Sequence, residues 1–204
     1  HDEGALKRLA SQLGVYIEQH PEVFQKRLIR DIAYTLGERR SHLQWRIALA
    51  ATSLDELALS LNGIGALPSR AAKVPKLAFV YTGQGAQWAG MGRELLGSHL
   101  IFADTVKAAD DCLKRMGASF SLIEELNKSK EESQVGKAHI SQPICTAVQL
   151  GLTALLESWG IKPSMVVGHS SGEIGAAFAT GAITLEAAMA AAYHRGQAAQ
   201  KINR

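Results

Sequence analysis

The sequence predicts an α/β fold with a parallel sheet, preceded by a small α+β unit. Two short apolar segments, residues 77–81 and 165–167, each lead into a turn rich in glycine. Helical sequence lies between these segments and again after the second, and strands that alternate with helices form parallel sheets with crossover helices. Residues 1–75 show helical patterns and a candidate strand, but no residues with an evident chemical role. We therefore expect two units, residues 1–75 and 76–204.

The first unit is predicted to consist mainly of helices. Apolar residues recur every three or four positions after Asp2, which is a suitable N-cap. Ser53 and Glu56 have the spacing of a capping box, which marks the start of another helix. The predicted elements are a helix over 3–18, helical turns over 28–36, a strand over 45–50, a helix over 53–62 and a connector over 63–75.

The second unit is predicted to alternate strands and helices. Its two apolar segments are too short for helices and end in turns, which is typical of buried strands. Ser121 and Thr184 are suitable N-caps for two of its helices. The predicted elements are a strand over 77–81, a helix over 91–116 broken near Gly97, a helix from 121, an exposed loop over 127–137, a helix over 141–159, a strand over 165–167, a helix over 174–179 and a helix from 184 to about 201.

The charge distribution gives no sign of a nucleic-acid partner. The net charge is only +3, and its 22 basic and 19 acidic residues are scattered along the chain. The longest uncharged stretch, residues 138–156, contains too many polar side chains for a lipid-facing helix. The N-terminal residues have no signal-peptide pattern. We expect neither a nucleic acid nor a membrane as partner.

Two cysteines, Cys112 and Cys145, lie among apolar helical residues. Such cysteines are typically buried reduced thiols, and their number and spacing fit neither a disulfide framework nor a metal site. We therefore expect no bound metal and a reducing, cytoplasmic location. The chain begins and ends inside helical patterns, at His1 and Arg204, which predicts a piece of a longer protein.

A Gly-x-Ser-x-Gly pattern is centred on Ser170, between Gly168 and Gly172. It directly follows the second apolar segment and directly precedes a helix, the context in which a nucleophile elbow exposes its serine hydroxyl. The N-terminal amides of the following helix would face developing negative charge. The pattern alone also fits an ordinary turn between a strand and a helix.

A second glycine-rich turn, Gly83-Gln84-Gly85, directly follows the first apolar segment. A serine enzyme that transfers acyl groups needs two donors for the oxyanion. One can be the backbone amide of Ser171, and the other an amide from a loop at the same sheet edge, such as that of Gln84. A phosphate-binding turn is the functional alternative, although no Gly-Lys-Ser or Gly-Lys-Thr sequence follows.

Arg195 follows a segment of small apolar residues, 187–192. An arginine in this setting often extends along the surface toward water. The alternative function is to bind a substrate carboxylate through its two-pronged guanidinium. Both interpretations remain open from these residues alone.

Together the motifs resemble a known family. The segments 81–88, 141–143, 168–173 and 193–196 occur in the order and spacing found in malonyl-CoA:acyl carrier protein transacylases, especially the acyltransferase domains of fungal highly reducing, type I iterative polyketide synthases. The resemblance covers Lys76 to the chain's end. It implies an α/β-hydrolase-like parallel core, incomplete in this chain, while residues 1–75 resemble the linker between ketosynthase and acyltransferase domains.

The resemblance implies catalytic roles for three residues. Ser170 corresponds to the nucleophile that accepts the acyl group. Gln84 and Ser171 correspond to the residues whose backbone amides form the oxyanion hole.

It also implies three substrate-binding residues. Arg195 corresponds to the arginine that binds the free carboxylate of the malonyl group, Gln142 to a glutamine that lines the pocket, and His169 to a residue that shapes the elbow. For His169, a merely packed histidine is an equal alternative.

The implied reaction transfers a malonyl extender unit from malonyl-CoA, through a serine ester, to the phosphopantetheine thiol of an acyl carrier protein. An adjacent ketosynthase domain is the other expected partner, and the domain itself is expected to bind no cofactor. A serine hydrolase or thioesterase of the α/β-hydrolase class is an alternative, as is a truncated fragment without catalysis. Arg195 favours the acyltransferase, because an esterase needs no cation directed at a carboxylate.

The sequence departs from the family's pattern at two points. Thr82 stands where stand-alone transacylases commonly have proline. Threonine at this position resembles the fungal synthases. The family's catalytic histidine lies well beyond the position of Arg204, and His194 is expected to point away from Arg195. We therefore expect these 204 residues alone to be inactive, with the base located after Arg204.

Overall fold

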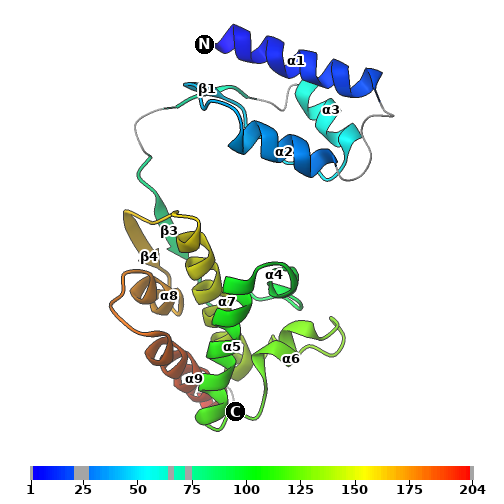
Figure 1. Cartoon of the computed structure of the whole chain (residues 1–204). Coiled ribbons are helices and arrows are strands. Elements are labelled where there is room, and N and C mark those ends of the chain that lie inside the picture. Colours follow the sequence, from blue (N-terminus) through cyan, green and yellow to red (C-terminus); the bar gives the residue numbers. More distant parts are fainter. Residues whose placement is uncertain (1, 21–27, 64–66, 72–74, 203–204) are drawn as a thin grey trace. The chain divides into compact units, whose positions relative to one another are not determined.

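The computed structural model describes residues 2–20, 28–63, 67–71 and 75–202. The chain forms two compact units, His1–Pro75 and Lys76–Arg204 (Figure 1).

The first unit contains three helices and one small sheet within its described residues. Asp2 caps the first helix by accepting a hydrogen bond of 2.7 Å from the amide of Ala5. Ser53 caps the third helix by accepting one of 3.1 Å from the amide of Glu56. The elements are α1 (Glu3–Gln19), α2 (Leu28–Glu38), β1 (Trp45–Arg46), α3 (Leu54–Asn62) and β2 (Ser69–Arg70).

Two predictions for this unit were wrong in extent. The strand expected over 45–50 is only Trp45–Arg46, because its antiparallel partner β2 offers just two residues for pairing. That partner lies inside the predicted connector 63–75, of which residues 64–66 and 72–74 fall outside the described part of the chain. A strand needs a neighbour for its backbone groups, so an apolar run without one does not extend the sheet.

The second unit places two parallel strands beside a set of helices. Its elements are β3 (Ala78–Tyr81), α4 (Arg93–Ser98), α5 (Leu100–Arg115), α6 (Leu122–Asn127), α7 (Ala138–Ser158), β4 (Met165–Gly168), α8 (Gly172–Ala179) and α9 (Leu185–Ile202). The strands pair in parallel as predicted, from Ala78 opposite Met165 to Tyr81 opposite Gly168. The glycine-rich turns therefore start side by side, at the carboxyl edge of both strands.

The core of this unit is helical. The helix α7 packs against α5 on one side and against α9 on another. Side chains that are fully buried among these helices and α6 include Phe102, Val106, Leu113, Leu122, Ile144, Leu150 and Met189. Burial of a large aliphatic or aromatic side chain contributes roughly 1.5–3 kcal/mol each, so the helices supply most of the stability that holds the two strands.

The expectation that both strands are buried was wrong. Tyr81 is buried and donates to or accepts from the Thr153 hydroxyl at 2.8 Å, but Val80, Met165 and Val167 are more than half exposed. Successive side chains of a strand point to opposite faces, and α8 contacts both strands. Among the described residues, no helix packs on the opposite face of the two strands, where Val80 and Val167 are exposed. Two strands alone do not define an α/β-hydrolase-like sheet.

Helix boundaries differ from the predictions where local geometry intervenes. The expected helix over 91–116 divides at His99, whose backbone is extended, and Gly97 lies inside α4. The helix α7 begins at Ala138, before the predicted residue 141, and contains Pro143. Thr184 caps α9 as predicted, since its hydroxyl accepts a hydrogen bond of 3.2 Å from the amide of Ala187.

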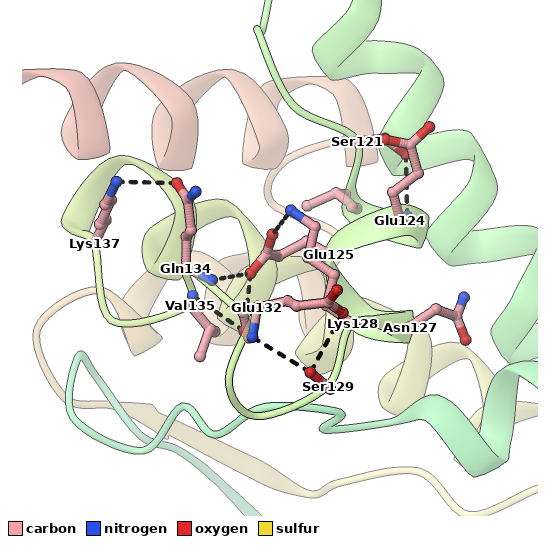
Figure 2. A network of polar contacts seen from close by, with 12 residues as sticks. Ser121, Glu124, Glu125, Asn127, Lys128, Ser129, Glu132, Gln134, Val135 and Lys137 are labelled. Carbon is pink, nitrogen blue, oxygen red and sulfur yellow. Dashed lines mark hydrogen bonds and ion pairs between the residues drawn. The ribbon is translucent and has the colours of Figure 1, made fainter.

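The loop expected to be exposed over 127–137 is anchored by Glu125, a buried carboxylate at the end of α6 (Figure 2). One carboxylate oxygen accepts from the Lys128 ammonium at 2.6 Å. The other accepts from the Ser133 hydroxyl at 2.8 Å and from the amide of Gln134. Burial alone would raise the pKa of Glu125, but these donors hold that pKa below its usual value.

Replacing Glu125 with Gln should lower the free energy of unfolding by about 2 kcal/mol, as expected when hydrogen bonds to a buried charge are lost. Glu124→Gln, the same change at the neighbouring exposed residue, should alter it by less than about 0.5 kcal/mol. Urea unfolding at neutral pH measures both.

The same pair of variants tests the titration of this site. Because folding lowers the pKa of Glu125, its stabilising contribution is fully present above the pKa of the unfolded carboxyl. The contribution is lost as the pH falls through the folded value. The difference between wild type and Glu125→Gln should therefore narrow in acid, and a difference that stays constant with pH would contradict this account.

Candidate active site

The site lies at the carboxyl ends of β3 and β4, where the two glycine-rich turns meet. The amide of His169 donates to the carbonyl of Tyr81 at 2.9 Å, which continues the pairing one step past the end of the strands. A methyl group built on Gly83 would lie 2.7 Å from the carbonyl oxygen of His169 and 3.1 Å from Cβ of Ser170. Only a glycine lets the first turn approach the second this closely.

Ser170 occupies the strained position of the elbow. Its φ of 55° makes it the one non-glycine residue in the described ranges with a left-handed backbone. This conformation costs roughly 1–2 kcal/mol for a residue with a Cβ atom. Ser170 is also exposed. Strain of this kind is typical of a nucleophile elbow.

The flanking glycines serve close contact rather than an unusual torsion angle. Neither Gly168 nor Gly172 has a positive φ. A methyl group at Gly172 would overlap the carbonyl of Tyr81, and one at Gly168 would overlap the backbone of Glu173. The two glycines around Ser170 are therefore needed because the elbow packs tightly against the neighbouring strand and against its own helix α8.

Arg195 reaches Ser170 from α9. Its Nη2 donates to Ser170 Oγ at 3.0 Å. Within the described residues its guanidinium forms no ion pair with a carboxylate, so its charge is available to a ligand. The fold thus brings a cation beside the exposed serine.

Three glutamines fix the turn that contains Gln84. Gln142 Nε2 donates to Gln84 Oε1 at 2.9 Å. Gln149 Nε2 donates to the carbonyl of Thr82 at 2.8 Å, and Gln87 Oε1 accepts from the amide of Gly85 at 2.7 Å. The sequence marks Gln142 through its motif, but it does not mark Gln87 or Gln149, because their hydrogen bonds to this turn leave no characteristic spacing.

The backbone amides of Gln84 and Ser171 form no hydrogen bond within the described part of the chain. Each follows the strand end by a few residues, and the amide of Ser171 also adjoins the N-terminus of α8. Unpaired amides at a helix N-terminus attract negative charge. An oxyanion hole would need donors of this kind, which have no other partner.

The remaining candidates lie in different surroundings. Gln142 is buried, and its Oε1 has no hydrogen-bond partner in the described structure. His169 is exposed beside Gly83, while the ring of His194 packs against that of Tyr193 with centroids 5.4 Å apart. No histidine or carboxylate within the described residues hydrogen-bonds to Ser170 Oγ.

Sequence comparison identifies the class of protein that this arrangement represents. Residues 78–203 match the family described as acyl transferase domain, and residues 1–61 match the family described as CurL-like, PKS C-terminal. The first match covers more than half of the chain. The chain therefore belongs to the acyl transferase domain family, the family that its motifs resemble.

The most similar curated proteins include fungal synthases. The chain is 58% identical over 197 residues to highly-reducing polyketide synthase 1 of Aureobasidium melanogenum, covering 97% of this chain and 9% of that protein. It is 45% identical over 203 residues to highly reducing polyketide synthase tstA of Talaromyces stipitatus, covering 98% of this chain and 8% of that protein. The chain thus spans less than a tenth of the length of these relatives. The resemblance to fungal highly reducing synthases is confirmed.

Solved structures agree with this family. The acyl transferase domain of ZmaA superposes with a TM-score of 0.87 at 31% identity, over 98% of this chain and 47% of that one. The acyltransferase domain from module 8 of the salinomycin polyketide synthase gives a TM-score of 0.80 at 28% identity, over 97% of this chain and 47% of that one. The chain spans about half the length of each. No described helix is both long and apolar enough to cross a membrane.

Replacing Gly172 with Ala should destabilise the unit by about 2 kcal/mol, because the added methyl overlaps the carbonyl of Tyr81. Gly97→Ala is the control, since a methyl there meets no atom within 4 Å and alanine is preferred to glycine inside a helix. Urea unfolding of both variants measures the difference. Equal stability of the two would show that the elbow is not tightly packed.

Proposed function

We propose that Ser170 accepts a malonyl group from malonyl-CoA and passes it to the phosphopantetheine thiol of an acyl carrier protein. The observation that carries this proposal is the contact of 3.0 Å between Arg195 Nη2 and Ser170 Oγ. It joins a strained, exposed serine to a guanidinium that has no carboxylate partner among the described residues. The family membership supports acyl transfer as the reaction.

In the first step, Ser170 Oγ attacks the thioester carbonyl as a base removes its proton. The carbonyl oxygen becomes negative and is stabilised by the free amides of Gln84 and Ser171. The bond from carbon to sulfur then breaks, and coenzyme A leaves as its thiol. In the second step the carrier's thiol gives its proton to the base and attacks the serine ester. The ester bond to Ser170 Oγ breaks, Oγ takes the proton from the base, and the malonyl thioester leaves.

The proposed role of Arg195 follows from the size of the malonyl group. The carboxylate carbon lies only two single bonds, about 2.5 Å, from the carbon that Ser170 attacks. A guanidinium that already contacts Oγ therefore needs little movement to bind that carboxylate with both prongs. Acetyl lacks the carboxylate, so it gains nothing from Arg195, and the site selects against it.

We infer that the base lies outside the described residues. The side chains of His169 and His194 form no hydrogen bond with Ser170. A serine hydroxyl without an adjacent base is a weak nucleophile. This inference agrees with the resemblance, which assigns the base to sequence after Arg204.

We also propose the surroundings of the site. Residues 1–75 act as the linker to a ketosynthase domain, and the two parallel strands belong to an α/β-hydrolase-like core. The match of residues 1–61 to a polyketide synthase family supports the first statement. Malonyl-CoA is a substrate, and no cofactor takes part. The two buried free thiols, Cys112 and Cys145, suit a reducing, cytoplasmic compartment.

Ser170→Ala should abolish covalent labelling by radioactive malonyl-CoA in a synthase that contains this sequence within a complete acyltransferase domain. Ser171→Ala is the matched control, because it removes a hydroxyl but keeps the backbone amide. It should retain labelling. Full labelling of the Ser170→Ala protein would mean that another residue carries the acyl group.

Arg195→Ala in the same synthase should reduce malonyl transfer by about a hundredfold or more, as expected when a bidentate charged contact is lost. Acetyl and propionyl transfer should hold or rise, because the nucleophile and the oxyanion donors stay in place. Transfer rates from the three thioesters measure this selectivity. An equal loss for all three would assign Arg195 a structural role instead.

A further inference from the structure

The position of Arg195 depends on how closely α9 approaches α7. Three buried residues of α9 with small side chains or none, Ala188, Ala192 and Gly196, follow one another at intervals of four. Residues at this spacing share one face of a helix. Small residues on a packed face allow two helices to lie near each other, and α7 is the main neighbour of α9.

Gly196 lies directly against the backbone at the start of α7. A methyl group at this position would lie 3.0 Å from the carbonyl oxygen of Ala138 and 3.0 Å from Cα of His139. It would also lie 3.4 Å from Cβ of Gln142. Carbon atoms in contact normally stay about 3.5–4.0 Å apart, so one helix would have to move. Because the obstructing atoms are mainly backbone, no side-chain rotation relieves the contact.

This contact is next to the proposed substrate-binding group. Gly196 follows Arg195 in sequence, and Arg195 Nη2 reaches Ser170 Oγ at 3.0 Å. The same turn of α7 includes Gln142, which holds the side chain of Gln84 at 2.9 Å. The first turns of α7 therefore form a common support for α9 and for the turn that carries Gln84. A small shift of α9 would move Arg195 relative to both Ser170 and Gln84.

We propose that Gly196 is a positioning residue that fixes the distance between Arg195 and Ser170 and thereby contributes to selection of a dicarboxylic acyl group. It acts through Arg195 and touches no substrate itself. This inference rests on the proposed function, since it assumes that Arg195 binds the carboxylate of the acyl group.

Gly151 provides a matched control on the other side of α7. A methyl group there would lie 2.7 and 2.8 Å from two ring carbons of Phe102, which belongs to α5. By these distances Gly151→Ala overpacks a helix contact at least as severely as Gly196→Ala does. It does so in the core, away from Arg195. Both variants should lose stability, but only one should change the choice of substrate.

The experiment uses a full-length synthase that contains this sequence within a complete acyltransferase domain. Malonyl-CoA and acetyl-CoA compete for acylation of the same serine, and mass spectrometry measures the ratio of the two esters. Unfolded protein contributes to neither ester, so the ratio is independent of the folded fraction. The variants are Gly196→Ala, Gly151→Ala, Arg195→Ala and the double variant Arg195→Ala with Gly196→Ala.

Gly196→Ala should lower the ratio of malonyl to acetyl ester by about tenfold, since a misplacement of about 1 Å can cost up to a hundredfold in rate. Acetylation should stay within about twofold of wild type on the same principle, because it does not use Arg195. Gly151→Ala should keep the wild-type ratio. The double variant should match Arg195→Ala, as expected when one residue acts through another.

An unchanged ratio in Gly196→Ala, an equal fall in Gly151→Ala, or additive losses in the double variant would each overturn the positioning role. If Arg195→Ala itself leaves the ratio unchanged, the proposed function fails, and the positioning role fails with it. If Gly196→Ala yields no folded protein, Arg195→Lys tests the same proposal. It keeps the positive charge but changes how far the cation extends toward Ser170, so the ratio of malonyl to acetyl ester should fall. Retention of the wild-type ratio by Arg195→Lys would overturn the proposal.

Discussion

Parallel pairing of β3 with β4 is the constraint on which the site depends. The ladder runs from Ala78 opposite Met165 to Tyr81 opposite Gly168, and the amide of His169 adds one further bond to Tyr81. Since the register is fixed, the turn around Gln84 and the elbow around Ser170 begin at the same level. A slip of one residue would reverse the faces of every side chain on one strand. The proposed oxyanion donors, the amides of Gln84 and Ser171, would then no longer start from the same level of the sheet edge.

The helices position the rest of the site around this ladder. Most of the fully buried side chains belong to α5, α6, α7 and α9, while the strands leave one face uncovered among the described residues. The rigid part of the unit is therefore the helical core, and α7 links it to the site through Gln142 and Gln149. This core can hold Ser170 in its left-handed conformation, since the strain of roughly 1–2 kcal/mol is small beside the burial energy.

Much of the fold and of the site could be predicted because the signals are local. Asp2, Ser53, Ser121 and Thr184 each cap a helix as their sequence context indicates. The elbow also has a local pattern, although the reason for its glycines lies in contacts with Tyr81 and Glu173. The roles of all six candidate site residues remain predictions from the resemblance, namely those of Ser170, Gln84, Ser171, Arg195, Gln142 and His169.

Features that depend on distant residues could not be predicted. The burial of Glu125 follows from donors that a loop brings back to it, and the pairing of β1 with β2 joins residues far apart in the chain. Likewise, the sequence around Arg195 is compatible both with a surface arginine and with an arginine that binds a substrate carboxylate. Its contact with Ser170 exists only because α9 returns to the elbow, where Gly196 allows it to approach α7.

A crystal structure of the malonyl ester in a complete acyltransferase domain that contains this sequence tests the central claim most directly. The account predicts that the ester is on Ser170 and that its carboxylate accepts two hydrogen bonds from Arg195. It further predicts that the ester carbonyl oxygen lies within hydrogen-bond distance of the amides of Gln84 and Ser171. A malonyl carboxylate that points into solvent, with Arg195 bound to protein groups only, would contradict it.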